Sequence, residues 1–189
     1  MRQPRPTVYA GGESEAARDL IAEQADAYVM HGDDPERIGR RVRDMSDRRA
    51  RLGKSPLQFG VAGYTIVRDT VGEAARELAR ITDVKQSAAG YGNYQQWIAN
   101  TQLEQRVSLA DYSVSNRGLR SGLIGTPDSV RDQVRAFEEV GVDLLLLQCS
   151  PQHEEMERFG REVITPLRAA RPSAVPTMPA RMLEGLSTW

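Results

Sequence analysis

Residues 7–35 read TVYAGGESEAARDLIAEQADAYVMHGDDP, and this stretch decides the fold class. Short apolar segments at 7–10 and 26–30 are typical of buried strands, and Ser14 stands where it can cap an intervening helix. Pro35 occupies the position favoured for the first residue of a second helix. The stretch therefore predicts a strand–helix–strand unit with parallel strands.

The alternation continues along the chain. Residues 59–67 (FGVAGYTIV) predict a longer strand and 71–81 a helix, whereas 85–125, rich in Gly, Asn, Gln and Ser, predict an inserted excursion with one or two short helices. After it, 126–141 predict a helix and 142–147 (VDLLLL) a parallel strand buried on both faces.

A final helix is expected from Pro151 onward. Four parallel strand–helix units with one insertion therefore predict an α/β fold. Periodicity alone leaves two architectures open, an open doubly wound sheet or half of an eight-unit barrel.

Composition excludes several classes of function. The 189 residues carry a net charge of −1, so no basic field favours nucleic acid or an anionic membrane, and no apolar stretch reaches the length of a membrane span. Cys149 is the single cysteine, which excludes an internal disulfide and disfavours zinc. The N-terminus lacks a secretory signal, so we expect a cytoplasmic protein without a metal.

The turn Ala10-Gly11-Gly12-Glu13-Ser14 is the most informative local feature. A strand ends there, glycines allow close approach of a ligand to the backbone, and the amides of a helix N-terminus favour an anion. The alternative is a tight turn with a capping serine and no ligand.

Four further residues are candidates for chemistry. His31 follows the second strand, and Tyr64 shares a strand face with Gly60 and Ala62; simple loop and packing roles are the alternatives. Arg117 and Arg120 lie in a loop, where their guanidinium groups suit phosphate, sulfonate or sulfone oxygens unless they are ordinary surface cations.

Five ordered segments resemble the luciferase-like flavin monooxygenases that oxidise sulfones and sulfonates, especially the dimethyl-sulfone monooxygenases. They are TVYAGGES at 7–14, DAYVMHGDDP at 26–35, FGVAGYTIVRD at 59–69, SNRGLRSGLIGTP at 115–127 and GVDLLLLQCSPQHEE at 141–155. The resemblance implies that parallel (β/α) units form the C-terminal half of a TIM-type (β/α)₈ barrel, with the insertion at about 85–125.

The resemblance also implies an activity and its site. Reduced FMN (FMNH2), delivered by an NAD(P)H-dependent flavin reductase, and O2 would convert dimethyl sulfone to methanesulfinate and formaldehyde. Ala10, Gly11, Gly12, Glu13 and Ser14 would hold the flavin phosphate. His31, Tyr64, Arg117 and Arg120 would lie at the catalytic centre.

The chain departs from the alkanesulfonate monooxygenases at the site. His31 replaces their tryptophan, Ala62 and Tyr64 replace a strand arginine and histidine, and Ser150 replaces a tyrosine. A site without those groups favours a small neutral sulfone over methanesulfonate or another alkanesulfonate.

The first strand resembles the fifth strand of the barrel, so we expect four units to be missing. Residues 1–170 would form the half barrel and 171–189 an extended, proline-containing tail. Because a half barrel exposes strand edges, we expect a homo-oligomer or pairing with an N-terminal half. The alternative functions are a non-catalytic remnant that retains a flavin or phosphate site, and a free-standing phosphate-binding domain.

Overall fold

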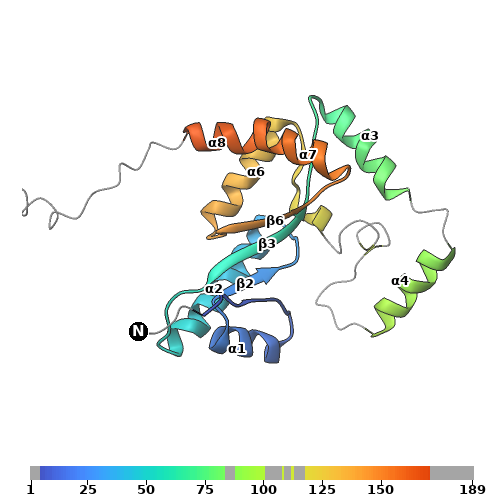
Figure 1. Cartoon of the computed structure of the whole chain (residues 1–189). Coiled ribbons are helices and arrows are strands. Elements are labelled where there is room, and N and C mark those ends of the chain that lie inside the picture. Colours follow the sequence, from blue (N-terminus) through green and yellow to red (C-terminus); the bar gives the residue numbers. More distant parts are fainter. Residues whose placement is uncertain (1–4, 84–87, 101–107, 109–111, 113–117, 171–189) are drawn as a thin grey trace, which may run out of the picture.

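The centre of the molecule is a parallel four-stranded sheet whose strands follow chain order. The computed structural model describes residues 5–83, 88–100, 108, 112 and 118–170. The strands lie in the order β1 (Tyr9–Ala10), β2 (Ala27–Met30), β3 (Gln58–Tyr64) and β6 (Leu144–Gln148) (Figure 1). A doubly wound sheet reverses its order near the middle, and this sheet does not. The strand order therefore excludes the open doubly wound alternative and agrees with consecutive units of a barrel.

Helices cover this sheet as one layer. These are α1 (Glu15–Gln24), α2 (Pro35–Arg51), α6 (Pro127–Glu139), and a final segment made of α7 (Gln152–Phe159), the π-helical η2 (Gly160–Ile164) and α8 (Thr165–Ala170). Helix α1 packs on α2, α2 on α6, and α6 on η2. Ser14, Asp34 and Thr126 cap α1, α2 and α6 with their side chains, so sequence-local signals fix where each helix begins.

The hydrophobic core lies between the sheet and this helix layer. Tyr28, Phe59 and Val61 are buried there, and the register places Tyr28 beside Phe59 and Val61 beside Leu145. On the opposite face of β6, Leu144 and Leu146 are 38% and 43% exposed. The prediction that 142–147 is buried on both faces is therefore wrong. Strand β6 lies at the edge of the sheet, and none of the described residues covers its second face.

The predicted strand 59–67 is divided at Thr65. The backbone N–H of Thr65 still donates to Gln148 on β6, at 3.0 Å, but that of Ile66 donates to Leu123, also at 3.0 Å. Beyond this point β4 (Ile66–Val67) pairs with β5 (Ile124–Gly125) in a separate two-stranded sheet. One residue thus marks where the chain leaves the main sheet.

The excursion starts earlier than the predicted residue 85. Helix α3 (Val71–Thr82) packs on β4 and β5, whereas the helix that packs beside α2 is α6. Helix α4 (Ala88–Asn100) and the 3-10 turn η1 (Gly118–Ser121) agree with the expected short helices. Helix α3 therefore belongs to the excursion, and α6 completes the third barrel unit.

The predicted tail at 171–189 lies outside the described residues. Among the residues that are described, no helix combines the length and apolarity needed to span a bilayer.

Candidate functional site

The turn Ala10–Ser14, here called the glycine turn, connects β1 to α1 at the carboxyl edge of the sheet. Ser14 has an extended backbone (φ −64°, ψ 154°), and its side-chain oxygen accepts a 3.3 Å hydrogen bond from the N–H of Ala17. A hydroxyl accepts and donates at once, so its hydrogen is still available for a ligand oxygen. Ser14 is exposed, so a ligand has access to it.

Close packing explains the glycines. A Cβ at Gly12 would stand 2.6 Å from the Cβ of Ala17, and one at Gly11 would stand 3.1 Å from the carbonyl oxygen of Val29. The buried hydroxyl of Tyr28 donates a 2.9 Å hydrogen bond to the carbonyl oxygen of Gly12. The turn therefore packs against both α1 and β2 and is bonded to Tyr28.

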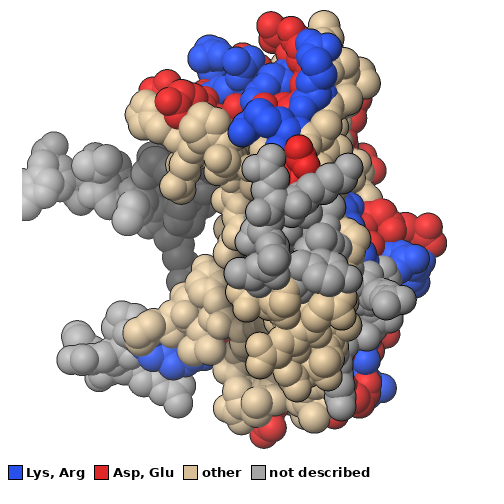
Figure 2. All heavy atoms as spheres, turned by 90° about the vertical axis from the view of Figure 1, so that its right-hand side faces the viewer, with Lys and Arg blue, Asp and Glu red and all other residues tan. Residues whose placement is uncertain are grey.

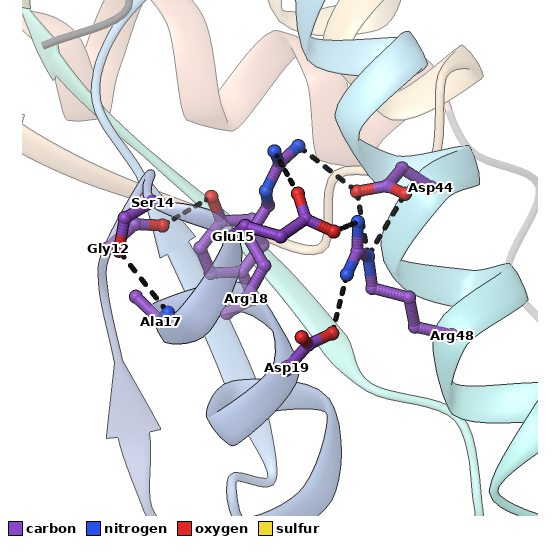
Figure 3. Close-up of polar contacts among 9 residues, drawn as sticks. Gly12, Ser14, Glu15, Ala17, Arg18, Asp19, Asp44 and Arg48 are labelled. Atoms are coloured by element: carbon purple, nitrogen blue, oxygen red, sulfur yellow. Dashed lines mark hydrogen bonds and ion pairs between the residues drawn. The ribbon is translucent and has the colours of Figure 1, made fainter.

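An ion-pair network fixes α1 to α2 beside the turn (Figure 3). Arg48 on α2 contacts Glu15 at 2.7 Å, Asp19 at 2.5 Å and Asp44 at 3.0 Å. The hydrogen bond to Glu15 is the main cause of the raised pKa of Arg48. Arg18 also contacts Glu15, at 2.9 Å. Glu15, the acidic group nearest the start of α1, is thereby paired with two cations, which reduces its repulsion of an anion at the turn.

A buried cluster of three charged side chains joins the glycine turn to the loop after β2. The guanidinium of Arg41 lies 3.8 Å from the carboxylate of Glu13 and 3.7 Å from that of Asp33, and all three side chains are nearly inaccessible. Since the Glu13 carboxylate is directed at Arg41, Glu13 offers a ligand its backbone rather than its side chain. Sequence reasoning identified Glu13 but missed Arg41 and Asp33, which are distant from it in sequence.

His31 lies between the glycine turn, which follows β1, and the carboxyl end of β3. It follows β2 directly and is half-buried. Neighbouring strands are about 4.8 Å apart, so β1 and β3 are separated by about 10 Å with β2 between them. The position of His31 at the carboxyl edge agrees with the prediction.

A second feature, here called the β3–β6 pocket, lies where β3 and β6 end. It is a cleft of about 600 Å³. The residues that line it are Tyr64, Arg80, Ile81, Leu147, Gln148, Cys149, Ser150 and Gln152. The register places Tyr64 beside Gln148, so the pocket brings Tyr64 together with the loop containing Ser150. Gln148, the last residue of β6, and Cys149, which follows it, were not among the predicted site residues, although both come directly after the predicted strand 142–147.

The hydroxyl of Tyr64 and the thiol of Cys149, which both line the pocket, are held in their neutral forms. Burial is the main cause of the raised pKa of Tyr64, and Cys149, Glu77 and Glu155 raise it further. Burial also raises the pKa of the Cys149 thiol, with a second contribution from Glu155. At neutral pH the pocket therefore presents an uncharged hydroxyl and an uncharged thiol.

The arginine loop is described only in part. Arg120 is half-buried in η1, which packs against β3, and the neighbouring Leu119 joins the cluster around Tyr64. Arg117 lies outside the described residues. Across the part of the chain that is described, no group of three or more His, Cys, Asp or Glu residues could hold a metal ion.

Comparisons with known proteins agree with this architecture. The family model described as luciferase-like monooxygenase matches residues 1–144. The FMNH(2)-dependent dimethylsulfone monooxygenase of Pseudomonas putida is 32% identical over 185 residues, covering 89% of this chain and 48% of the relative. The enzyme of the same name from Pseudomonas fluorescens (strain Pf0-1) is 33% identical over 171 residues, covering 87% and 47%.

A solved structure gives the same result for the fold. Riboflavin lyase with modified FMN and riboflavin superposes with a TM-score of 0.70 at 19% identity, covering 87% of this chain and 43% of that one. The chain spans about half the length of the curated relatives that it matches. Its fold therefore corresponds to part of a luciferase-like barrel.

Proposed function

Because this chain belongs to the family of luciferase-like monooxygenases, we propose that it forms the flavin-phosphate side of an FMNH2-dependent monooxygenase for a small organosulfur compound. The proposed reaction converts dimethyl sulfone to methanesulfinate and formaldehyde. One oxygen atom of O2 enters the substrate carbon and the other leaves as water, while reduced FMN supplies two electrons and two protons. A cytoplasmic NAD(P)H-dependent reductase is the proposed source of reduced flavin.

The glycine turn carries the proposal. Ser14 is exposed at the start of a ten-residue helix, and its side chain both caps α1 and has a hydrogen to donate. Amides of the first helical turn and the helix dipole favour a phosphate at this position. The turn is close-packed around Gly11 and Gly12, so it offers the phosphate a rigid backbone. The residues present therefore fit the phosphate of FMN.

The remaining site residues have proposed roles on the substrate side. Tyr64 would donate from its neutral hydroxyl to a substrate oxygen, because the raised pKa keeps the proton in place. His31 would border the flavin between the glycine turn and the β3–β6 pocket. Arg120 would lie on the substrate side near Tyr64, because η1 packs against β3. Arg117, which is outside the described residues, stays a predicted site residue. When bound, reduced FMN would supply the activation of oxygen.

The exposed face of the sheet indicates that the chain binds a partner. Leu144 and Leu146 are exposed on the face of β6 opposite the helices, and β1 and β6 each have one strand edge without a partner strand in the described structure. A second set of four strand–helix units, or a second copy of this chain, would cover this face. Without such a partner, the second candidate function is flavin or phosphate binding without catalysis.

Titration of FMN into the Ser14→Ala variant tests the phosphate site. Hydrogen bonds to charged groups contribute about 1.5–3 kcal/mol, so we expect the affinity to fall about tenfold or more. Thr126→Ala is the matched control, since Thr126 caps α6 through an equivalent 3.3 Å bond from Ser129. Both variants lose about 1 kcal/mol of capping energy, but only Ser14→Ala should weaken flavin binding. Equal affinities of the two variants would remove the turn from the flavin site.

Turnover separates the two candidate functions. The chain is supplied with a flavin reductase, NAD(P)H and dimethyl sulfone, with and without an added N-terminal half of the Pseudomonas putida relative, and formaldehyde is measured. Formaldehyde formation only with the added half supports the monooxygenase. Flavin binding without turnover in either mixture supports the binding module. Faster oxidation of methanesulfonate than of dimethyl sulfone would contradict the proposed substrate.

A further inference from the structure

Four charged side chains, alternately acidic and basic, form an ion-pair network beside the β3–β6 pocket. Glu155 on α7 contacts Arg68 at 2.8 Å, Arg68 contacts Glu77 on α3 at 3.7 Å, and Glu77 contacts Arg80 at 2.6 Å. Arg68 and Glu155 are bonded twice, at 2.8 Å each. Arg80 and Glu77 are also bonded twice, at 2.6 and 3.0 Å. Two carboxylates match two guanidinium groups, so this network of four side chains has no net charge.

Arg80 is the cation that lines the pocket, and its charge is already matched. Arg80 donates two hydrogen bonds to Glu77, and these direct its guanidinium group at the carboxylate. Its side chain is 61% exposed, whereas that of Glu77 is 17% exposed, so the carboxylate is the better fixed of the two. In the upper part of Figure 2, basic side chains lie together and acidic side chains surround them. An anionic ligand would therefore have to compete with Glu77 for Arg80.

The other groups on the pocket wall carry no charge at neutral pH. Gln148, Ser150 and Gln152 are neutral by nature. Glu77 and Glu155 both raise the pKa of Tyr64, and Glu155 also raises that of Cys149, so the hydroxyl and the thiol keep their protons. A substrate oxygen in the pocket can accept hydrogen bonds from amide, hydroxyl and thiol groups. A sulfonate would gain no net attraction from the network beside the pocket, because its two guanidinium groups are matched by two carboxylates.

We propose that Glu77 determines the charge selectivity of the β3–β6 pocket: by holding Arg80 it makes the pocket accept small uncharged polar ligands, such as a sulfone, and disfavour their anionic counterparts. The inference rests on the proposed function only for the choice of organosulfur ligands. Glu77 is a positioning residue, because it acts through Arg80.

The single cysteine provides a direct measurement. Cys149 lines the pocket, and the chain contains no other thiol. Its thiolate attacks the sulfenyl sulfur of an alkyl methanethiosulfonate, forms a mixed disulfide and releases methanesulfinate. Three reagents are compared, bearing an uncharged methyl, an anionic sulfonatoethyl or a cationic trimethylammonioethyl group. Dividing each charged-reagent rate by the uncharged-reagent rate in the same variant removes any change in the thiol pKa.

Glu77→Gln should raise the normalised rate of the anionic reagent about fivefold, and Arg80→Gln should lower it, because each removes one charge of opposite sign beside the pocket. The increase for Glu77→Gln should diminish in high salt. Glu36→Gln is the matched control, since it breaks the Glu36–Arg40 pair on α2 and changes the net charge equally. Its normalised rate should be that of the wild type.

The outcomes decide the proposal separately from flavin binding and turnover. Opposite shifts in Glu77→Gln and Arg80→Gln support it, whether or not the Ser14 titration succeeds. A change below twofold in both variants, or an equal change in Glu36→Gln, overturns it. Circular dichroism of each variant establishes that the fold is retained, and if Glu77→Gln unfolds, the direction of the Arg80→Gln shift alone decides.

Discussion

The hydroxyl of Tyr28 on β2 donates a 2.9 Å hydrogen bond to the carbonyl oxygen of Gly12, in the turn that follows β1. This bond couples two neighbouring units at the point where the flavin phosphate is proposed to bind. Tyr28 is 1% exposed, so its ring and hydroxyl are fixed by packing.

Tyr28→Phe removes this hydroxyl and keeps the ring. We expect a loss of about 0.5–1.5 kcal/mol in the free energy of unfolding, together with weaker FMN binding, because the Gly12 carbonyl loses its donor. Urea unfolding and flavin titration measure the two effects. Unchanged FMN affinity in a folded variant would show that the turn keeps its shape without the bond.

Gly12→Ala tests the close approach of the turn to α1. The new Cβ would meet the Cβ of Ala17 at 2.6 Å, so α1 or the turn must move, at a cost of about 1–3 kcal/mol. Gly72→Ala is the control, since its Cβ would have only the flexible end of Arg76 nearby, at 3.5 Å. We expect the control to be as stable as the wild type or more stable. Equal stability of the two variants, measured in urea, would contradict the packing argument.

Asp26→Asn tests the attachment of the first strand. Asp26 accepts two hydrogen bonds from Arg5, at 2.6 Å each, and one from the N–H of Val8, at 2.8 Å. The bonds from Arg5 are the main cause of its lowered pKa. A lowered carboxyl pKa contributes stability above its unfolded value of about 3.9, and this contribution is lost as the pH falls through the folded value.

The wild type should therefore be more stable than Asp26→Asn at pH 7, and the difference should shrink as the pH falls below about 4. Urea unfolding at several pH values measures it. Asp132→Asn, which removes an exposed pair with Arg135 on α6, should change stability little. A difference between wild type and Asp26→Asn that is independent of pH would exclude the ionised pair as its source.

Leu146→Lys tests the partner face of the sheet. Full burial of an exposed leucine contributes about 1.5–3 kcal/mol, and Leu146 is 43% exposed, so a partner that covers it gains a little under half of that. A lysine there also places an unpaired charge in the interface, so it should weaken association at least tenfold. Leu20→Lys is the control, because Leu20 is 60% exposed on α1, on the helix layer. Both variants should unfold like the wild type. Sedimentation velocity of the chain alone, and mixed with an N-terminal half, should show a loss only for Leu146→Lys; equal association of the two variants would exclude this face.

Local chemistry predicted the helix starts well. Ser14, Pro35 and Thr126 mark the beginnings of α1, α2 and α6, because capping depends on residues within one turn. The alternation of strands and helices also led to parallel pairing. The resemblance then distinguished barrel units from a doubly wound sheet, a choice that depends on how distant strands are ordered and that periodicity does not contain.

Features that depend on distant neighbours could not be predicted. Leu144 and Leu146 have the composition of a buried strand, and only the absence of a described neighbour beyond β6 exposes them. The segment 59–67 has uniform strand character, yet it is divided at Thr65. The residues before Thr65 pair with β6, and the residues after it pair with β5. The pocket cation Arg80 was missed because its position depends on how α3 packs.

The change of partner at Thr65 separates two kinds of evolutionary freedom. The backbone donates to β6 at Thr65 and to Leu123 at the next residue, so the register of the main sheet is settled before the excursion starts. The two ends of the segment from Ile66 to Gly125 pair with each other, so we expect that changes in the length or sequence of this segment leave the register of the main sheet intact. Arg80 lies within that segment and the glycine turn does not, so the residue proposed to contact the ligand and the proposed flavin-phosphate site can change independently.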